Sequence, residues 1–302
     1  MKPRPTNHPH RPTNPSETLP AQILEHLAAL KVSFSREQLD HVLHQAEQNS
    51  WSYLELLEAF LSPPAQSRRE RSVEHRIRTA RFPGTHTLEQ FDWAFNAAAI
   101  DRLQIEELAT GDFIRRKDNL LMVGNSGVGK THLMEGIGRR ACVLGYRVRY
   151  SLSEEMLAEL GASLADGTTL QCVRDYLRPE LLIIDGFGFD RIEREQSPQA
   201  LNLLYKVIDR RNTKYSTALI TNVEFDEWNQ YLSDGPMVMA LLDRLFDRAI
   251  ILRIDGKSYR AHRARRLPPP GPKTPRSSSS AAKAKRWGWF VGRGFIGMGL
   301  RR

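Results

Sequence analysis

The residues from Gly124 to Thr131 have the types and spacing of a loop that binds phosphate groups. They fit the pattern G-x-x-x-x-G-K-[ST] in full. Glycines in such a loop let backbone N–H groups turn toward a phosphate, and the N-terminus of the following helix adds partial positive charge. Lys130 can bridge two phosphate groups, and the Thr131 hydroxyl can bind Mg²⁺. The candidate nucleotide-binding residues are Gly124, Asn125, Ser126, Gly127, Val128, Gly129, Lys130 and Thr131.

An acidic residue at the end of a second apolar run supports this interpretation. Asp185 closes the run Leu181–Asp185, and we expect it to hold Mg²⁺ together with Thr131. The next position, where hydrolytic ATPases of this class commonly carry an acid, is Gly186. A glycine cannot accept a proton from the attacking water. Asp190 or Glu193 could take that role, or hydrolysis is slow or absent, since a positioned base contributes about 10²–10⁴-fold to the rate.

Two polar residues further along could act on the terminal phosphate. Asn222 follows a predicted strand and could lie between that phosphate and the water, although asparagine also suits a simple turn. Arg244 could reach the nucleotide of a neighbouring subunit as an arginine finger, or it could form a surface pair with Asp243. Arg211 is a second candidate for the finger. The predicted catalytic residues are Lys130, Asp185, Asn222 and Arg244.

Apolar runs that alternate with helical patterns between residues 82 and 256 indicate the elements that position these residues. The predicted strands are Asn119–Val123, Arg147–Ser151, Leu181–Asp185, Ala218–Thr221 and Ile250–Ile254. The helical patterns include Leu133–Leu144, Glu154–Leu164 and Gln199–Arg211. This alternation is typical of an α/β fold with a parallel sheet covered on both faces.

The N-terminal quarter differs in composition from this region. Residues 1–20 have the composition of a disordered segment, and residues 21–62 show the helical periodicity of a small helical module. We expect Pro63 and Pro64 to end its third helix.

An arginine-rich segment, residues 65–81, follows the two prolines. Its arginines could neutralise DNA phosphates, or they could belong to a solvated helix with local pairs such as Glu74–Arg78. The candidate DNA-binding residues are Arg68, Arg69, Arg71, Arg76 and Arg78.

Composition and charge exclude several other classes of protein. The 302 residues suit one large domain and a small one, and no apolar run approaches the roughly 20 residues of a membrane helix. The N-terminus lacks the apolar core of a secretory signal, and the two cysteines belong to no paired motif, so we expect a cytoplasmic protein without disulfides. Of 44 basic residues, 13 lie between Lys257 and Arg302, which contains no acid, leaving 31 basic against 35 acidic residues elsewhere. Such a tail attracts polyanions or is simply a solvated extension.

Taken together, these motifs resemble the IstB-like transposition helper ATPases, which are related to the DnaC-type helicase loaders. The resemblance covers nearly all of residues 19–264, and its more specific parts are Arg78–Pro83 and Gly256–Arg260. It implies a P-loop NTPase of AAA+ type with a five-stranded parallel sheet, preceded by a small N-terminal helical domain. It also implies ATP and Mg²⁺ as cofactors, homo-oligomers on double-stranded DNA, and a DDE-type transposase as partner. In this family Asn222 would be a sensor, Arg244 the finger in trans, and Arg260 a further residue near the nucleotide.

The resulting hypothesis is an ATP-dependent DNA-binding transposition helper with ATPase activity. A DnaC-like helicase loader and an ATP-binding scaffold impaired in hydrolysis remain alternatives. The expected domains are a disordered 1–20, a helical DNA- or partner-binding 21–81, an AAA+ ATPase 82–264, and a basic, disordered tail 265–302 that matches nothing in the family after Leu267.

Overall fold

The structure is a computed structural model of the 302-residue chain, and it describes residues 15–187, 198–228 and 235–266. The N-terminal helices are α1 (Pro15–Ala29), α2 (Arg36–Gln48) and α3 (Tyr53–Ala80). The elements up to the second strand are η1 (Leu88–Gln90), α4 (Arg102–Ala109), α5 (Asp112–Arg116), β1 (Asn119–Gly124), α6 (Lys130–Val143) and β2 (Val148–Leu152). The remaining elements are α7 (Ser153–Ala165), α8 (Thr169–Leu177), β3 (Leu181–Phe187), α10 (Pro198–Arg211), β4 (Ser216–Thr221), η2 (Phe225–Glu227), α12 (Gly235–Phe246), β5 (Ala249–Ile254) and α13 (Tyr259–Arg266).

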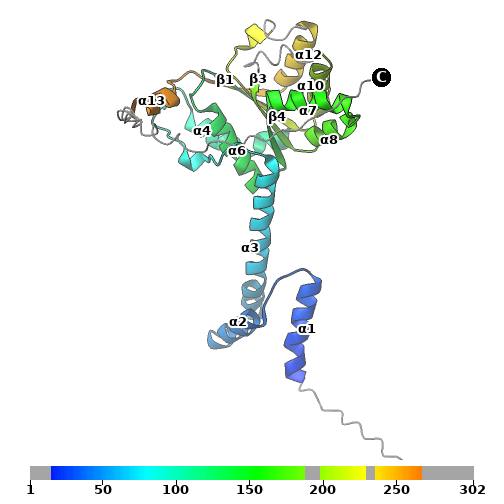
Figure 1. The fold of residues 1–302 in the computed structure, drawn as a ribbon. Helices are drawn as coiled ribbons and strands as arrows, with labels where there is room; N and C mark the ends of the chain where they lie inside the picture. The colour runs from blue at the N-terminus through cyan, green and yellow to red at the C-terminus, as the bar shows by residue number, and fades with distance from the viewer. Residues whose placement is uncertain (1–14, 188–197, 229–234, 267–302) are drawn as a thin grey trace, which may run out of the picture. The chain divides into compact units, whose positions relative to one another are not determined.

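Five parallel strands form one sheet in the order β2-β3-β4-β1-β5 (Figure 1). Every predicted strand is present, and the bounds differ most at β3, which continues to Phe187, and at β4, which begins at Ser216. β1 and β4 are buried along their whole length, as expected for central strands with both faces covered. The predicted α/β fold with a five-stranded parallel sheet is therefore confirmed. Since the strands are parallel, the residues that follow β1, β3 and β4 meet at one edge of the sheet.

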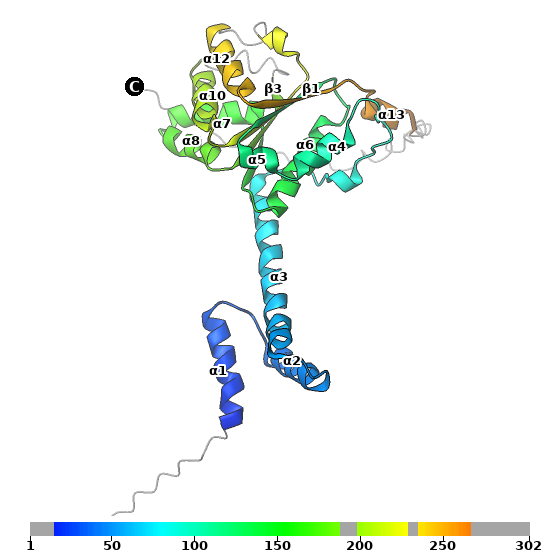
Figure 2. The same ribbon diagram turned by 180° about the vertical axis from the view of Figure 1, so that it is seen from behind.

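Helices cover the two faces of the sheet as two separate apolar layers. Helices α7, α8, α10 and α12 pack on the face that carries Leu121, Leu182 and Leu219. Helices α4, α5 and α6 pack on the opposite face, against Leu120 and Ile183. Figure 2 shows the two groups of helices from behind, on either side of the strands. The helix that follows the phosphate loop, α6, is thus held against the sheet along its length, with Leu133, Met134 and Ile137 among its buried residues.

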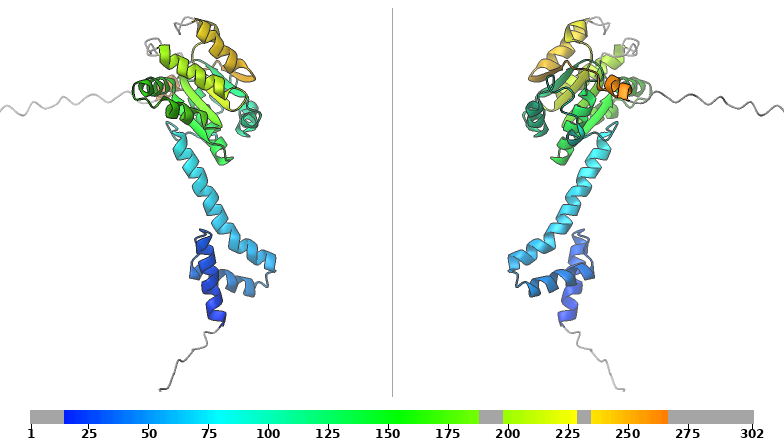
Figure 3. Two further views of the ribbon diagram at one scale, coloured as in Figure 1. Left: turned by 90° about the vertical axis from the view of Figure 1, so that its right-hand side faces the viewer. Right: turned by 90° about the vertical axis from the view of Figure 1, so that its left-hand side faces the viewer.

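Helix α3 is one continuous helix of 28 residues, so the prediction that Pro63 and Pro64 end the third helix is wrong (Figures 1 and 3). Each proline removes a backbone hydrogen bond, at a cost of about 3 kcal/mol in a helix interior. Contacts at both ends offset this cost. A capping box between Ser52 and Glu55 closes the first turn, and the Phe60 ring lies 4.4 Å from that of Phe34 between centroids. At the other end Ala80 is fully buried in the apolar layer beside α6.

Helix α1 begins earlier than the composition indicated. It starts at Pro15, inside the segment 1–20 that we expected to be disordered. Proline is well tolerated in the first turn of a helix, because the N–H that it lacks has no partner there. The expectation for residues 1–14 and for the tail after Leu267 lies outside the described residues. Within the part of the chain that is described, no helix combines the length and apolar character needed to cross a membrane.

Candidate nucleotide-binding site

The predicted phosphate loop joins the end of β1 to the start of α6. Its first residue, Gly124, has a φ of 147°, and a Cβ atom built there would lie 2.1 Å from the carbonyl oxygen of Ile254 on β5. Only glycine allows the chain to leave β1 so close to the neighbouring strand. The helix then begins at Lys130, so its N-terminus faces the carboxyl edge of the sheet. The strand, loop and helix that the motif requires are all present.

The structure brings Lys130 together with Asn222. Its Nζ donates to Asn222 Oδ1 at 2.7 Å and to the carbonyl oxygens of Gly124 and Asn125 at 2.6 and 2.9 Å. The side chain is only 5% exposed. Burial lowers the pKa of Lys130 to about 8; the Asp185 charge opposes this and the Arg260 charge adds to it. Arg260 therefore lies close enough to Lys130 for its charge to act on the ammonium group.

Thr131 and Asp185 also meet, on the side where a metal ion is expected. Thr131 Oγ1 donates to Asp185 Oδ2 at 2.8 Å, and Asp185 is 8% exposed. A hydroxyl and a carboxylate are oxygen ligands of the kind that Mg²⁺ prefers, and phosphate oxygens and water complete its coordination in such sites. The residues present therefore fit a nucleotide-bound magnesium ion.

A third group in this cluster was missed by the sequence analysis. Tyr150, on β2, donates its hydroxyl to the same oxygen, Asp185 Oδ2. Burial and the Asp185 charge raise the pKa of Tyr150, which keeps this hydroxyl protonated. No motif spacing marks Tyr150, because it reaches Asp185 only through the pairing of β2 with β3.

Gly186 occupies a β-bulge, which explains why this position tolerates no ordinary side chain easily. Asp185 pairs with Ile220 and Phe187 pairs with Thr221, so Gly186 is an extra residue in β3. Its φ is 78°, in the left-handed region that favours glycine. The two carboxylates considered as replacements for the missing acid, Asp190 and Glu193, lie outside the described residues.

Two segments distant in sequence pack directly on the glycines of the loop. The Phe91 ring lies against Gly129, where a Cβ atom would come within 2.8 Å of it. Ser258 lies against Gly127, where a Cβ atom would come within 2.4 Å of its Oγ, and the Tyr259 N–H donates to the Gly127 carbonyl at 2.9 Å. The loop is therefore fitted between an N-terminal segment and the start of α13.

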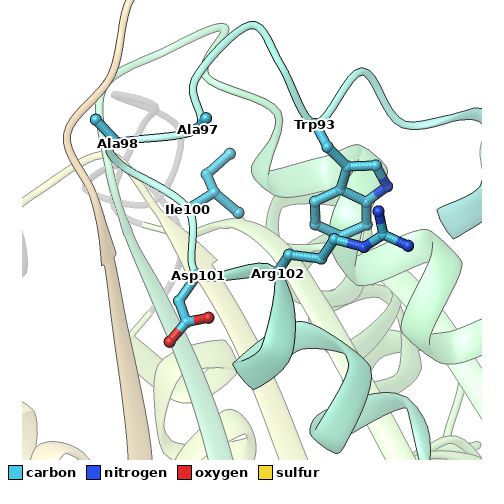
Figure 4. A pocket seen from close by; sticks show the side chains of 6 residues that line it. All are labelled: Trp93, Ala97, Ala98, Ile100, Asp101 and Arg102. Atoms are coloured by element: carbon cyan, nitrogen blue, oxygen red, sulfur yellow. The ribbon is translucent and has the colours of Figure 1, made fainter.

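Asn96 ties these two segments together. Its Nδ2 donates to the Lys257 carbonyl and its Oδ1 accepts from the Lys257 N–H, both at 3.0 Å. Beside it lies a cavity of about 480 Å³, in which the Arg102 guanidinium stands 5.3 Å from the centroid of the Trp93 ring (Figure 4). The cavity is lined by Trp93, Ala97, Ala98, Ile100, Asp101 and Arg102. None of these residues was singled out from the sequence, although the aromatic residues of this stretch are a visible signal.

The two arginines considered as fingers have different surroundings. Arg244 pairs with Asp209 and Asp243 at 2.8 and 2.6 Å, and its side chain is 37% exposed, so it remains available at the surface of α12. Arg211 is fully buried and donates to three carbonyl oxygens, those of Tyr176, Pro179 and Ser216. The proposal of Arg211 as a finger is therefore wrong: its guanidinium satisfies buried backbone groups.

The candidate DNA-binding arginines lie on the C-terminal half of α3. All are exposed except Arg76, which is half-buried. Arg71 donates to the Ser67 carbonyl and Arg78 contacts His75 rather than Glu74. Within the described residues none of the five arginines forms an ion pair, so their charges are not neutralised locally.

The chain is similar in sequence to ATP-binding proteins of insertion sequences. A Pseudomonas aeruginosa protein named "Insertion sequence IS21 putative ATP-binding protein" is 32% identical over 240 residues, which cover 80% of this chain and 89% of that relative. A Geobacillus stearothermophilus protein named "Insertion sequence IS5376 putative ATP-binding protein" is 30% identical over 244 residues, 81% of this chain and 95% of the relative. The crystal structure of the DnaC helicase loader matches 59% of this chain and 98% of its own, with 18% identity and a TM-score of 0.44. The family described as "IstB-like ATP binding protein" matches residues 25–267, and the chain belongs to that family.

Proposed function

We propose that this chain is an ATPase that binds ATP with Mg²⁺, assembles on double-stranded DNA and assists a transposase. The observation that carries the proposal is the convergence of Lys130, Thr131, Asp185 and Asn222 at the mouth of the phosphate loop. The names of its relatives, which are ATP-binding proteins of insertion sequences, support the link to transposition. A bacterial insertion-sequence protein of this kind would act on DNA in the cytoplasm.

Each residue of the cluster has a distinct task in nucleotide binding. Lys130 exchanges its bonds to two loop carbonyls for bonds to phosphate oxygens, and Arg260 adds a second positive charge beside it. Thr131 and Asp185 hold Mg²⁺, which neutralises charge on the phosphates when bound. Asn222 contacts Lys130 and would orient water at the terminal phosphate. Together these contacts favour a triphosphate over ligands with less charge.

DNA binding and oligomerisation follow from surfaces outside this cluster. The unpaired arginines of α3, Arg68 and Arg69 among them, supply charge for the DNA backbone. Arg244 on α12 is proposed to reach the nucleotide of a neighbouring subunit, after release from Asp209 and Asp243. A DDE-type transposase is the proposed partner.

Gly186 favours a second candidate function, an ATP-bound scaffold that turns over slowly. The bulge at Gly186 leaves no carboxylate beside Asp185 on β3. In such a protein ATP binding alone would drive assembly on DNA, and hydrolysis would not be needed for it.

The test is the mass of the complex formed with a duplex DNA, measured with and without Mg²⁺-ATP. The proposal predicts a larger assembly in the presence of ATP for the wild-type chain. Lys130→Ala should abolish nucleotide binding and the ATP-dependent increase in mass. An ATP affinity unchanged by Lys130→Ala would refute the site. An assembly that forms while no phosphate is released would select the scaffold.

A further inference from the structure

The hydroxyl of Tyr150 is a buried polar group that forms a hydrogen bond with Asp185. Tyr150 is 3% exposed, and its side chain lies in the apolar layer beside α6, with the Phe82 ring 6.1 Å away between centroids. A phenylalanine would suit that layer equally well. A buried hydroxyl costs free energy unless it is hydrogen-bonded, and this one donates to Asp185 Oδ2.

Two hydroxyl groups converge on this carboxylate oxygen from different parts of the fold. Thr131 belongs to the first turn of α6 and is next to Lys130, which must rearrange when phosphate binds. Tyr150 belongs to β2, where it pairs with Ile183 of β3 in the register of the sheet. The bond from Tyr150 therefore fixes Asp185 relative to the sheet, independently of the loop.

The other carboxylate oxygen, Asp185 Oδ1, has no hydrogen-bond partner among the described residues. With Oδ2 held by two donors, the carboxylate cannot rotate freely about its terminal bond. The orientation of the metal-binding oxygen is thus set before any ion arrives, and pre-organisation of this kind lowers the cost of binding.

We propose that Tyr150 is a positioning residue for nucleotide-bound Mg²⁺, acting through Asp185. The inference rests on the proposed function, because it concerns the same nucleotide site. It predicts that the hydroxyl matters for the metal and not for the nucleotide's other contacts. Those contacts come from Lys130 and the loop, which Tyr150 does not bond.

The experiment uses Tyr150→Phe in the full chain, with Tyr176→Phe as the matched control. Tyr176 is equally buried and donates its hydroxyl to the carboxylate of Glu159 at 2.6 Å, on α7 and away from the loop. ATP binding is measured by calorimetry in excess EDTA and across a Mg²⁺ titration. Tyr150→Phe should raise the Mg²⁺ concentration for half-saturation about 10- to 100-fold, the range for one hydrogen bond to a charged group. ATP affinity in EDTA should be unchanged, and Tyr176→Phe should behave as wild type in both measurements.

A Mg²⁺ requirement that is the same in Tyr150→Phe and wild type would overturn the inference, as would an equal change in both tyrosine variants. If Tyr150→Phe loses its thermal unfolding transition, Tyr150→Leu and Tyr150→Met, which also lack a donor to Asp185, replace it. A normal Mg²⁺ requirement in a folded variant overturns the inference. In an Asp185→Ala background, Tyr150→Phe should cause no further loss. A wild-type chain that binds no ATP at all refutes the proposed function as well, whereas ATP binding with an unmoved Mg²⁺ requirement refutes this inference alone.

Discussion

Replacing Gly186 by alanine and by glutamate separates two effects: the cost of a side chain in the left-handed backbone conformation, and the absence of a carboxylate that could act as a base in ATP hydrolysis. The φ of 78° costs an ordinary residue about 1–2 kcal/mol. A Cβ atom built at Gly186 meets no atom within 4 Å among the described residues, so no steric cost is added. Both variants should therefore lose about 1–2 kcal/mol of unfolding free energy, which lowers Tm by about 2–8 °C for a domain of this size.

Only Gly186→Glu also restores a carboxylate beside Asp185. If the missing base limits hydrolysis, Gly186→Glu should release phosphate from Mg²⁺-ATP faster than Gly186→Ala, by up to about 10²–10⁴-fold. Tm is measured by calorimetry and turnover by steady-state phosphate release at saturating ATP. Equal turnover in the two variants would show that another group already acts as the base or that chemistry is not limiting. An unchanged Tm in Gly186→Ala would refute the argument from the left-handed conformation.

Four further predictions concern basic side chains. ATP should bind about tenfold more weakly at pH 9 than at pH 7, because a lysine with a pKa of about 8 is mostly neutral at pH 9; calorimetry showing constant affinity would contradict the assignment of Lys130. Between pH 8 and 10.5 the unfolded chain retains this proton and the folded chain does not, so Lys130 makes the folded chain more stable as pH rises. Arg211→Met should lower the unfolding free energy by about 3–5 kcal/mol in urea titrations, since it leaves buried carbonyls unpaired; a stability within 1 kcal/mol of wild type would argue against that role. Neutralising Arg68, Arg69 and Arg71 together should weaken DNA binding, and the dependence of the binding constant on salt should fall by the amount expected for about three lost phosphate contacts. An unchanged DNA affinity would show that these arginines do not contact DNA.

The parallel sheet and the phosphate loop were predictable because their signals are local. A strand buried on both faces is a continuous apolar run, as in β1 and β4, and the loop motif has a fixed spacing. Parallel strands bring their carboxyl ends to one edge, and this topology explains why Lys130 and Asn222 are in contact.

The features that could not be predicted depend on contacts between distant parts of the chain. The continuity of α3 through Pro63 depends on the burial of Ala80 and on the contact of the Phe60 ring with that of Phe34, which outweigh a local helix breaker. Arg211 is buried because its guanidinium donates to backbone carbonyl groups between α8 and β3. The periodicity of apolar residues in the sequence does not indicate which carbonyl groups need such a donor. Tyr150 looks in sequence like an ordinary core residue of a strand.

The three hydrogen bonds of the Lys130 ammonium group turn the binding of a phosphate at this position into an exchange of acceptors. An incoming phosphate must replace the two main-chain carbonyl oxygens that accept from the ammonium group. A nucleoside without phosphates has no phosphate oxygen that could accept these hydrogen bonds, whatever its base. If the loop binds nucleotides as proposed, we expect it to discriminate against dephosphorylated metabolites without any contact to the base.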